Sequence, residues 1–293
     1  MDNRKQFIEY ALKINALKYY QEFLETLKKK QNKEIEKTVV YKALTLLLED
    51  NQNAFAKCIP QGQVFYRARK IKFSDNFPMP EDGFELINNK LSGFDSYNSK
   101  EPPIGIGGEG RNNVAGQSYL YLSEDEFTAC IEVNPIRGEA ISVAKFCLKK
   151  TIQIIDFQNN QSVSSLKEFA EMHNISATKL ITLVMQEYCT PAYKADSYLV
   201  TQYISDYIRK KRYDGIKFLS SKNSRFNLTI FNCDESIIQW ESSSVFYCSA
   251  VLPELYDLNE GKRITPTAKI LTQDDCDEIK NRIVKHVNNP FKN

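Results

Sequence analysis

Apolar residues near the start of the chain recur every three or four positions. This spacing runs from residue 4 to residue 30 and is that of an amphipathic helix. A second stripe of the same kind covers residues 39–48, after a polar break at Gln31 and Asn32. The pattern predicts two helices joined by a turn, which form a small helical module over residues 1–60. For this module we expect a role in packing or in contact with a partner protein.

Residues 63–69 alternate in the manner of a β-strand. Because successive side chains of a strand point to opposite faces, Arg67 and Arg69 share one face. A single arginine on a strand is usually exposed to solvent, whereas two on one face that lead into a loop favour an anion site. Residues 71–118 contain four prolines. We expect them to form a long irregular stretch, of the kind that makes lids and binding loops.

The end of that stretch is rich in glycine, with five glycines between residues 105 and 116. Glycine permits positive φ and a close approach of the backbone to a ligand. Arg111 lies among the glycines, and its planar, forked donors suit phosphate. A strand at 119–122 follows, and Ser123 begins a capping-box pattern that predicts a helix containing Glu132. Together these elements favour one side of an anion-binding cleft; the alternative is an ordinary glycine-rich surface loop.

The remaining chain alternates between strand-like and helical patterns. Strands are expected at 140–148, 151–157, 216–219, 227–231, 237–240 and 245–252, and helices at 163–173, 176–188, 197–211 and 274–287. Ser176 is the expected N-cap of the second of these helices. The polar face of the third contains Gln202, Asp206 and Arg209.

Composition narrows the classes of function. The formal net charge of +2 gives no whole-protein sign of nucleic-acid binding, and the basic clusters at 28–30 and 209–212 suit solvated helix ends. The first residues lack the apolar core of a signal peptide, and no apolar run reaches the length of a membrane span. We therefore expect a cytoplasmic protein without a membrane partner and without a nucleic-acid partner.

The number and the spacing of the cysteines and histidines exclude further kinds of chemistry. The seven cysteines are scattered and show no CxxC spacing, so neither a zinc site nor a disulfide framework is expected. The two histidines, His173 and His286, lie near no nucleophile motif. Ser-His and Cys-His catalysis and a histidine-rich metal site are disfavoured. An enzyme built from this chain would work without a histidine base.

Three blocks of sequence, taken in order, resemble the RES-domain family, which is named for its Arg, Glu and Ser residues. The blocks lie at 65–69, 110–132 and 202–231. The resemblance implies an α+β fold like that of ADP-ribosyltransferases, with a mixed β core and flanking helices. It also implies a RES-like catalytic domain over 61–235, after the helical module, and a C-terminal extension over 236–293 that packs on that domain.

The resemblance also implies roles for single residues. Arg67, Glu132 and Ser220 match the family's arginine, glutamate and serine and would be catalytic. The residues that would bind the substrate are Arg69, Gly110, Arg111, Asn113, Tyr121 and Ser221. Two positions depart from the family, since Asn112 replaces a common Trp and Phe218 a common Tyr. The second departure leaves the choice between the two neighbouring serines open.

RES-domain proteins are bacterial toxins that consume NAD⁺, and many are paired with an antitoxin. The resemblance thus implies a toxin or effector that cleaves the nicotinamide–ribose bond of NAD⁺, as a glycohydrolase or a phosphorylase. Nicotinamide leaves as a neutral base and needs no proton, so a histidine-poor site suffices. A carboxylate such as Glu132 would stabilise the oxocarbenium-like ribose. Arg111, with Arg67 or Arg69, would bind the pyrophosphate.

Other interpretations stay open. Tyr121 would stack on nicotinamide or bind a ribose hydroxyl, but it also fits a core position; Glu132 also fits a solvent-facing helix position and Ser220 a turn. The same site could instead transfer ADP-ribose to a protein, or the chain could be an inactive NAD-binding module. NAD⁺ is the expected substrate, no metal is required, and an antitoxin or other protein partner would contact the N-terminal helices.

Overall fold

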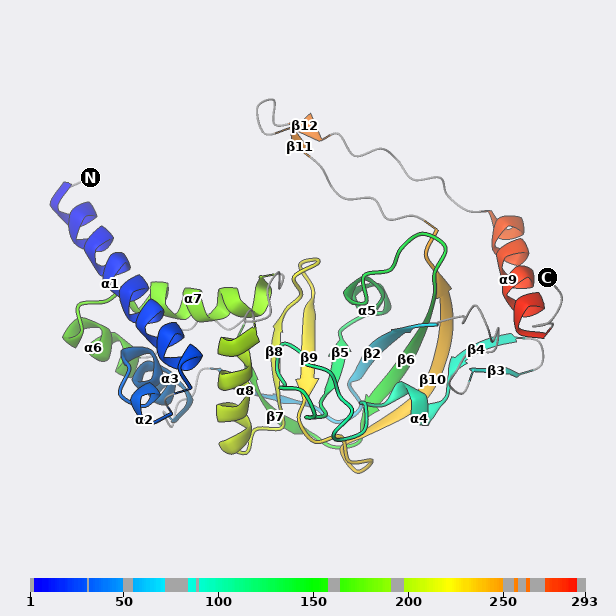
Figure 1. Ribbon diagram of the computed structural model, residues 1–293, viewed down its shortest axis with the longest axis horizontal. Coiled ribbons are helices and arrows are strands. Elements are labelled where there is room, and N and C mark those ends of the chain that lie inside the picture. The colour runs from blue at the N-terminus through cyan, green and yellow to red at the C-terminus, as the bar shows by residue number, and fades with distance from the viewer. Residues whose placement is uncertain are drawn as a thin grey trace. The chain divides into compact units, whose positions relative to one another are not determined.

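The computed structural model of the chain has a mixed α+β fold (Figure 1). It describes residues 3–30, 32–49, 55–71, 84–87, 90–157, 164–190, 198–249, 256–257, 262–263 and 272–288. The largest sheet has eight strands in the order β1-β7-β8-β9-β5-β2-β6-β10. They are β1 (Ala56–Ile59), β7 (Ile152–Asp156), β8 (Gly215–Leu219), β9 (Phe226–Ile230), β5 (Leu120–Ser123), β2 (Val64–Lys70), β6 (Ala140–Leu148) and β10 (Ile238–Tyr247). The predicted α+β class is confirmed.

Helices and two short hairpins complete the description. The helices are α1 (Asn3–Lys28), α2 (Asn32–Ile35), α3 (Val39–Glu49), α4 (Ser96–Ser99), α5 (Glu126–Glu132), α6 (Ser164–Met172), α7 (Ala177–Cys189), α8 (Leu199–Lys210) and α9 (Gln273–Asn288). The hairpins pair β3 (Phe84–Ile87) with β4 (Lys90–Phe94) and β11 (Tyr256–Asp257) with β12 (Lys262–Arg263). The predicted irregular stretch at 71–118 thus contains a hairpin and a one-turn helix, and its residues 72–83 and 88–89 lie outside the described part.

Contacts divide the chain into two compact units. The first comprises Met1–Gln63, Glu101–Tyr121 and Lys149–Ile237, and the second comprises Val64–Lys100, Leu122–Leu148 and Ile238–Asn293. Each unit is assembled from separate segments of the chain. The domain boundaries expected at residues 61 and 235 follow the linear order of the sequence and stay a prediction.

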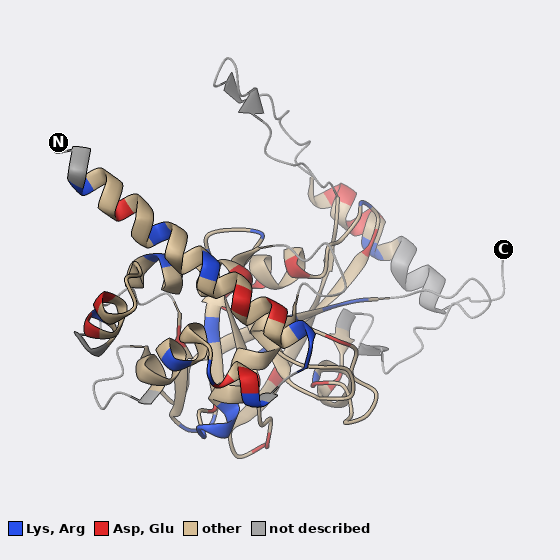
Figure 2. Cartoon of the chain, turned by 60° about the vertical axis from the view of Figure 1, so that its left-hand side comes forward, with Lys and Arg blue, Asp and Glu red and all other residues tan. Residues whose placement is uncertain are grey.

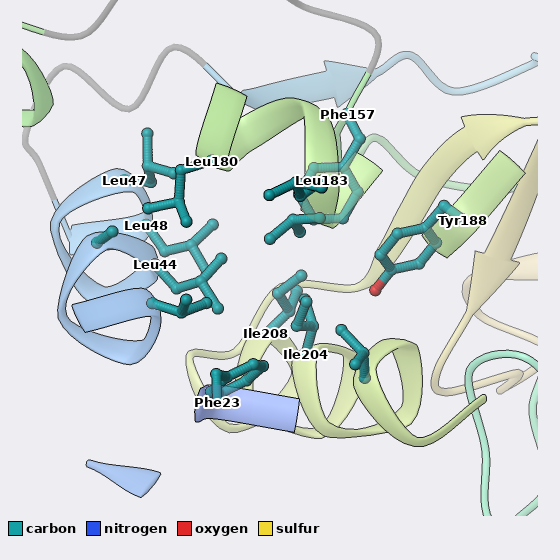
Figure 3. Close-up of a cluster of buried hydrophobic side chains, with 14 of the residues drawn as sticks. Phe23, Leu44, Leu47, Leu48, Phe157, Leu180, Leu183, Tyr188, Ile204 and Ile208 are labelled. Carbon is teal, nitrogen blue, oxygen red and sulfur yellow. The ribbon is translucent and has the colours of Figure 1, made fainter. Parts of the chain in front are cut away.

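The core of the first unit joins the N-terminal helices to the later ones. Phe23 of α1 and Leu44 of α3 are buried in one cluster with Leu183 of α7 and with Ile204 and Ile208 of α8 (Figure 3). Charged residues of both signs occur along the length of α1 (Figure 2). Because the cluster is continuous, the same burial of apolar surface holds all four helices.

The strands of the first unit include one that the sequence pattern did not predict. Strand β1 pairs antiparallel with β7, from Ala56 opposite Ile155 to Ile59 opposite Ile152. The expected helical module therefore ends in a strand. Strands β7 and β8 are parallel, and β8 and β9 form an antiparallel hairpin. Gly215 begins β8, and a Cβ there would lie 2.3 Å from the Thr229 carbonyl oxygen, so only glycine fits.

The second unit contains an antiparallel ladder of β2, β6 and β10. Strand β10 is one continuous strand with a register shift between Trp240 and Ser242, whereas the sequence pattern predicted two strands at 237–240 and 245–252. The polar run at 241–244 interrupts the apolar pattern, but β10 is the last strand of the sheet. An edge strand exposes part of its length and tolerates polar residues and bulges, which explains the wrong prediction.

Candidate functional site

The side chain of Gln202, in α8, holds the loop at residues 109–113 by hydrogen bonds. The Gln202 side-chain nitrogen Nε2 donates to Glu109 Oε1 and to the Gly110 carbonyl, each at 3.0 Å, and to the Asn113 carbonyl at 3.1 Å. Gln202 is only 8% exposed. Gln202 belongs to the predicted polar face of α8, and it is buried there because the glycine loop folds over it.

Asn112 and Tyr121 form a second layer of this network. Asn112 is 1% exposed; its Nδ2 donates to Thr229 Oγ1 at 2.7 Å, and its Oδ1 accepts from Ser205 Oγ at 2.9 Å. The Asn112 backbone N–H donates to the Tyr121 hydroxyl at 2.8 Å, and that hydroxyl donates to Asn113 Oδ1 at 2.7 Å. Polar groups that are both buried and paired specify one conformation, so the loop is held in place.

Tyr121 is therefore part of the support of the loop. Its hydroxyl both accepts and donates within the network. Burial raises the pKa of Tyr121 above its ordinary value, so the hydroxyl stays protonated into the alkaline range. The expected contact of the hydroxyl with ribose stays a prediction, and the ring is the part of the side chain that the network does not use.

Gly110 is required for packing. A Cβ at this position would lie 2.5 Å from Asn113 Oδ1 and 2.7 Å from the Tyr121 hydroxyl oxygen. The backbone itself closes the turn, since the Gly110 N–H donates to the Asn113 carbonyl at 3.0 Å. Three of the residues predicted to bind substrate, Gly110, Asn113 and Tyr121, are thus in direct contact.

Arg111 projects from the same loop to the end of a helix. Its guanidinium donates to the Glu187 carbonyl and, at 2.9 Å, to the Thr190 carbonyl, and it lies 5.4 Å from the centre of the Tyr198 ring. These carbonyls are at the C-terminus of α7, where a positive charge complements the helix dipole. A guanidinium has five N–H donors, more than these two bonds use. A phosphate contact by Arg111 stays a prediction.

Ser220 and Ser221 lie in the turn between β8 and β9. Ser220 is buried; its N–H donates to the Arg225 carbonyl at 2.8 Å, and its hydroxyl oxygen accepts from the Lys222 N–H at 3.0 Å. This is the local bonding of a serine turn. The geometry fits the structural interpretation of Ser220, and its chemical role stays a prediction, as does that of Ser221.

In the second unit, Arg67 and Arg69 reach the same short helix, as their shared face predicts. Arg67 Nη1 donates to the Ser99 carbonyl at 2.7 Å, and Arg69 Nη1 donates to the Asn98 carbonyl. The Arg69 guanidinium also lies 4.8 Å from the centre of the Phe94 ring. Like Arg111, both arginines therefore hold carbonyls at a helix end, and their contact with an anion stays a prediction.

Glu132 is the last residue of α5, half-buried in the second unit. The predicted capping box at Ser123 is wrong, because Ser123 is paired with Tyr66 in the sheet. The N-cap is Asp125, whose side chain accepts from the Thr128 N–H at 2.7 Å. A carboxylate at the C-terminus of a helix is unfavourable for the helix dipole. Such a local conflict is typical of functional residues and makes Glu132 a candidate.

Sequence reasoning missed the residues beneath the loop. Gln202, Ser205 and Thr229 belong to a helix and a strand that are distant in sequence from residues 109–113. The signal that could have found them is the third family-like block, at 202–231, which contains all three residues. Within the described residues, no group of three or more His, Cys, Asp or Glu could hold a metal ion. Every described helix is too short or too polar to span a bilayer.

Comparison with known proteins identifies the class. Residues 90–249 match the family model of the RES domain, which is more than half of the chain. The chain belongs to the RES-domain family. It is also similar to a chain in the crystal structure of the M. tuberculosis MbcT–MbcA toxin–antitoxin complex, with 10% sequence identity and a TM-score of 0.36, over 72% of this chain and 95% of that chain. No curated protein sequence matches.

Proposed function

We propose that this protein is a toxin or effector that cleaves the nicotinamide–ribose bond of NAD⁺ and so depletes the NAD⁺ of the cell. Membership of the RES-domain family supports a NAD⁺-consuming activity. The structural observation that supports the proposed site is the buried hydrogen-bond network, which fixes the loop that contains Arg111 and Asn113 and joins it to Tyr121. A rigid loop loses little entropy when it binds a ligand.

In the proposed reaction, the bond between the ribose C1″ and the nicotinamide nitrogen breaks, and its electron pair stays on nicotinamide. The ring leaves as a neutral base, so no acid is needed. The Glu132 carboxylate stabilises the positive charge that develops on ribose, as carboxylates do in glycoside hydrolysis. Water or phosphate then bonds to C1″, and water loses its proton to solvent.

The other predicted residues bind and orient the dinucleotide. The guanidinium groups of Arg67, Arg69 and Arg111 have the donors that a pyrophosphate accepts from. The Tyr121 ring supports the nicotinamide, and Ser220 or Ser221 positions either the carboxamide or the attacking group. We further propose that residues 61–235 form the catalytic domain and that residues 236–293 pack on it. The protein acts in the cytoplasm under the control of an antitoxin.

Release of nicotinamide from NAD⁺ by the purified chain tests the proposal. Mass spectrometry with and without phosphate separates the products: ADP-ribose indicates hydrolysis, ADP-ribose 1″-phosphate indicates phosphorolysis, and label fixed on protein indicates transfer. Glu132→Gln should lower the rate by about a hundredfold, the usual cost of removing one transition-state stabiliser. Glu126→Gln, in the first turn of the same helix, is the matched control.

Two results would contradict this proposal. If the wild-type chain neither releases nicotinamide nor binds NAD⁺ in a calorimetric titration, the chain is an inactive module. If Glu132→Gln and Glu126→Gln release nicotinamide at the wild-type rate, the assignment of Glu132 is wrong.

A further inference from the structure

Helix α1 has a row of large apolar side chains that face solvent. Phe7, Tyr10, Ile14 and Leu17 are 72%, 64%, 45% and 39% exposed. Their spacing of three, four and three residues places them along one line of the helix, as in the seam of a coiled coil. We call these four residues the α1 stripe.

A different side of α1 holds it to the first unit. The buried row consists of Ala16, Tyr20, Phe23 and Leu27. Two hydrogen bonds add to this packing: Asn15 Nδ2 donates to the Asn174 carbonyl at 2.9 Å, and the Ser176 N–H donates to the Leu12 carbonyl at 3.2 Å. At about 100° per residue, the two rows are centred about 130° apart. The helix therefore cannot roll to bury the α1 stripe without exposing Phe23.

We infer that the α1 stripe is a docking surface for an amphipathic helix of a partner protein. The partner helix has apolar residues at heptad spacing and acidic residues on either side of them. Such a helix would pack its apolar residues between those of the α1 stripe and bury a row that now faces water.

The charges beside the α1 stripe select the acidic partner. Lys13 and Lys18 are exposed and flank the stripe on opposite sides, at the positions where coiled-coil helices exchange salt bridges. Lys13 is bonded to Glu9 at 2.7 Å, but this is an exposed pair, which contributes little and can be exchanged. The acidic residues Glu22 and Glu25 lie nearer the C-terminus of α1, beyond Leu17, the last residue of the stripe.

The same charges disfavour a second copy of this chain. In a parallel pair of α1 helices, position 13 of one copy faces position 18 of the other, so lysine would face lysine. A lipid surface is disfavoured by the width of the α1 stripe. Helices that lie in a membrane interface need a broad apolar face, whereas a row with strict three-four spacing is the narrower seam of helix pairing.

A pair of designed peptides tests this inference on the full chain. Both peptides are helices of about three heptads with leucine at the seam; one has glutamate at the flanking positions and the other lysine. The wild-type chain should bind the glutamate peptide in preference to the lysine peptide. Ile14→Asp should weaken binding of the glutamate peptide by about tenfold or more. Ile14→Ser, which adds no charge, should weaken it in the same direction.

Reversing the charges beside the α1 stripe distinguishes a lost contact from misfolding, because a misfolded chain would lose binding to both peptides. Lys13→Glu with Lys18→Glu should reverse the preference, so that the lysine peptide binds better. Lys29→Glu with Lys33→Glu makes the same change in net charge at exposed sites outside α1 and should leave the preference unchanged. The titrations contain no NAD⁺, so their outcome does not depend on the proposed enzymatic activity.

Several outcomes would overturn the inference. Binding of neither peptide, or equal binding of both, would show that the α1 stripe does not select an acidic helix. A dimer seen by light scattering that Ile14→Asp dissociates would assign the stripe to a second copy. Binding to vesicles of phosphatidylcholine and phosphatidylserine that Ile14→Asp abolishes would assign it to a lipid surface.

Discussion

The side chain of Gln202 donates a hydrogen bond to the backbone carbonyl of Asn113 at 3.1 Å, across almost ninety positions of sequence. The same nitrogen also faces the Gly110 carbonyl and the Glu109 carboxylate, each at 3.0 Å. One carboxamide of α8 thus satisfies several acceptors of the loop that presents Arg111. The position of this loop depends on a residue that need not touch the substrate.

Gln202→Ala should therefore affect both stability and substrate binding. Unpaired buried carbonyls cost about 1–3 kcal/mol, so the free energy of unfolding in urea should fall by about that amount. Because the loop is no longer fixed, the KM for NAD⁺ should rise by about tenfold, with a smaller change in kcat. Gln186→Ala, on the exposed surface of α7, is the control. A loss of stability with an unchanged KM would limit Gln202 to a structural role.

Gly110 and Gly108 allow a matched comparison within the loop. A Cβ at Gly110 would collide with Asn113 and Tyr121, whereas a Cβ at Gly108 meets nothing within 4 Å. Gly110→Ala should lower the free energy of unfolding by about 1–3 kcal/mol, the usual cost of overpacking. Gly108→Ala should leave it nearly unchanged. Equal effects of the two substitutions in urea titrations would show that the loop is not packed as described.

The elements with a long periodic pattern could be predicted from the sequence. The stripe at 4–30 forms α1, and Ser176 caps α7 as expected, with its hydroxyl accepting from the Lys179 N–H. Strand β1 could not be predicted, because four residues show no useful alternation and this strand depends on its pairing with β7. Elements of this length are fixed by tertiary contacts rather than by local preference.

In the candidate site, too, contacts between distant parts of the chain could not be predicted from the sequence. Glycine, arginine and tyrosine in the block at 110–121 pointed to the loop, and the structure joins Gly110, Asn113 and Tyr121 by contact. The interpretation of Ser123 as an N-cap is wrong because a residue cannot pair in a strand and cap a helix at the same time. Ser123 pairs with Tyr66 in the sheet. The burial of Gln202 could not be anticipated, since helix periodicity places it on the polar face and only the distant loop covers it.

Buried tyrosines should make the protein sensitive to alkali. Burial raises the pKa of Tyr121 and of Tyr188 above the ordinary value of 10.0. The pKa of Tyr20 is also raised, mainly by burial and secondly by the hydrogen bond to Glu187. Below pH 10.0 these hydroxyls are protonated in both the folded and unfolded states. As pH rises above that value, only the unfolded chain loses its protons, so the free energy of unfolding should fall.

Urea titrations on either side of pH 10.0 measure this effect, and Tyr121→Phe should make the fall less steep. Tyr10→Phe is the control, because Tyr10 is exposed on α1. A free energy of unfolding that does not decrease above pH 10.0 would contradict the raised pKa values.

An apolar cavity in the first unit offers a stabilising substitution. Leu44 of α3 and Leu180 and Val184 of α7 are among its lining residues. Val184→Ile adds one methyl group to this space and should raise the free energy of unfolding by about 0.8 kcal/mol. Val200→Ile is the control, because Val200 is buried but does not line the cavity, so overpacking should destabilise it. A lower melting temperature for Val184→Ile would show that the space is already filled.

Arg111 has two roles to separate, a structural contact with the end of α7 and a predicted contact with pyrophosphate. Lysine keeps the charge but cannot donate to the Glu187 and Thr190 carbonyls in the same forked geometry. Arg111→Lys should therefore lower the free energy of unfolding by about 1–2 kcal/mol. Arg137→Lys, at an exposed position, is the control.

The rise in melting temperature that NAD⁺ produces then separates the two roles, since at a fixed concentration a ligand stabilises the folded state more when it binds more tightly. If Arg111 binds the pyrophosphate, this rise should be smaller in Arg111→Lys than in the wild type, beyond the loss seen without ligand. A lower melting temperature with the full NAD⁺-dependent rise would show that Arg111 only holds the end of α7, and the pyrophosphate would then depend on Arg67 and Arg69.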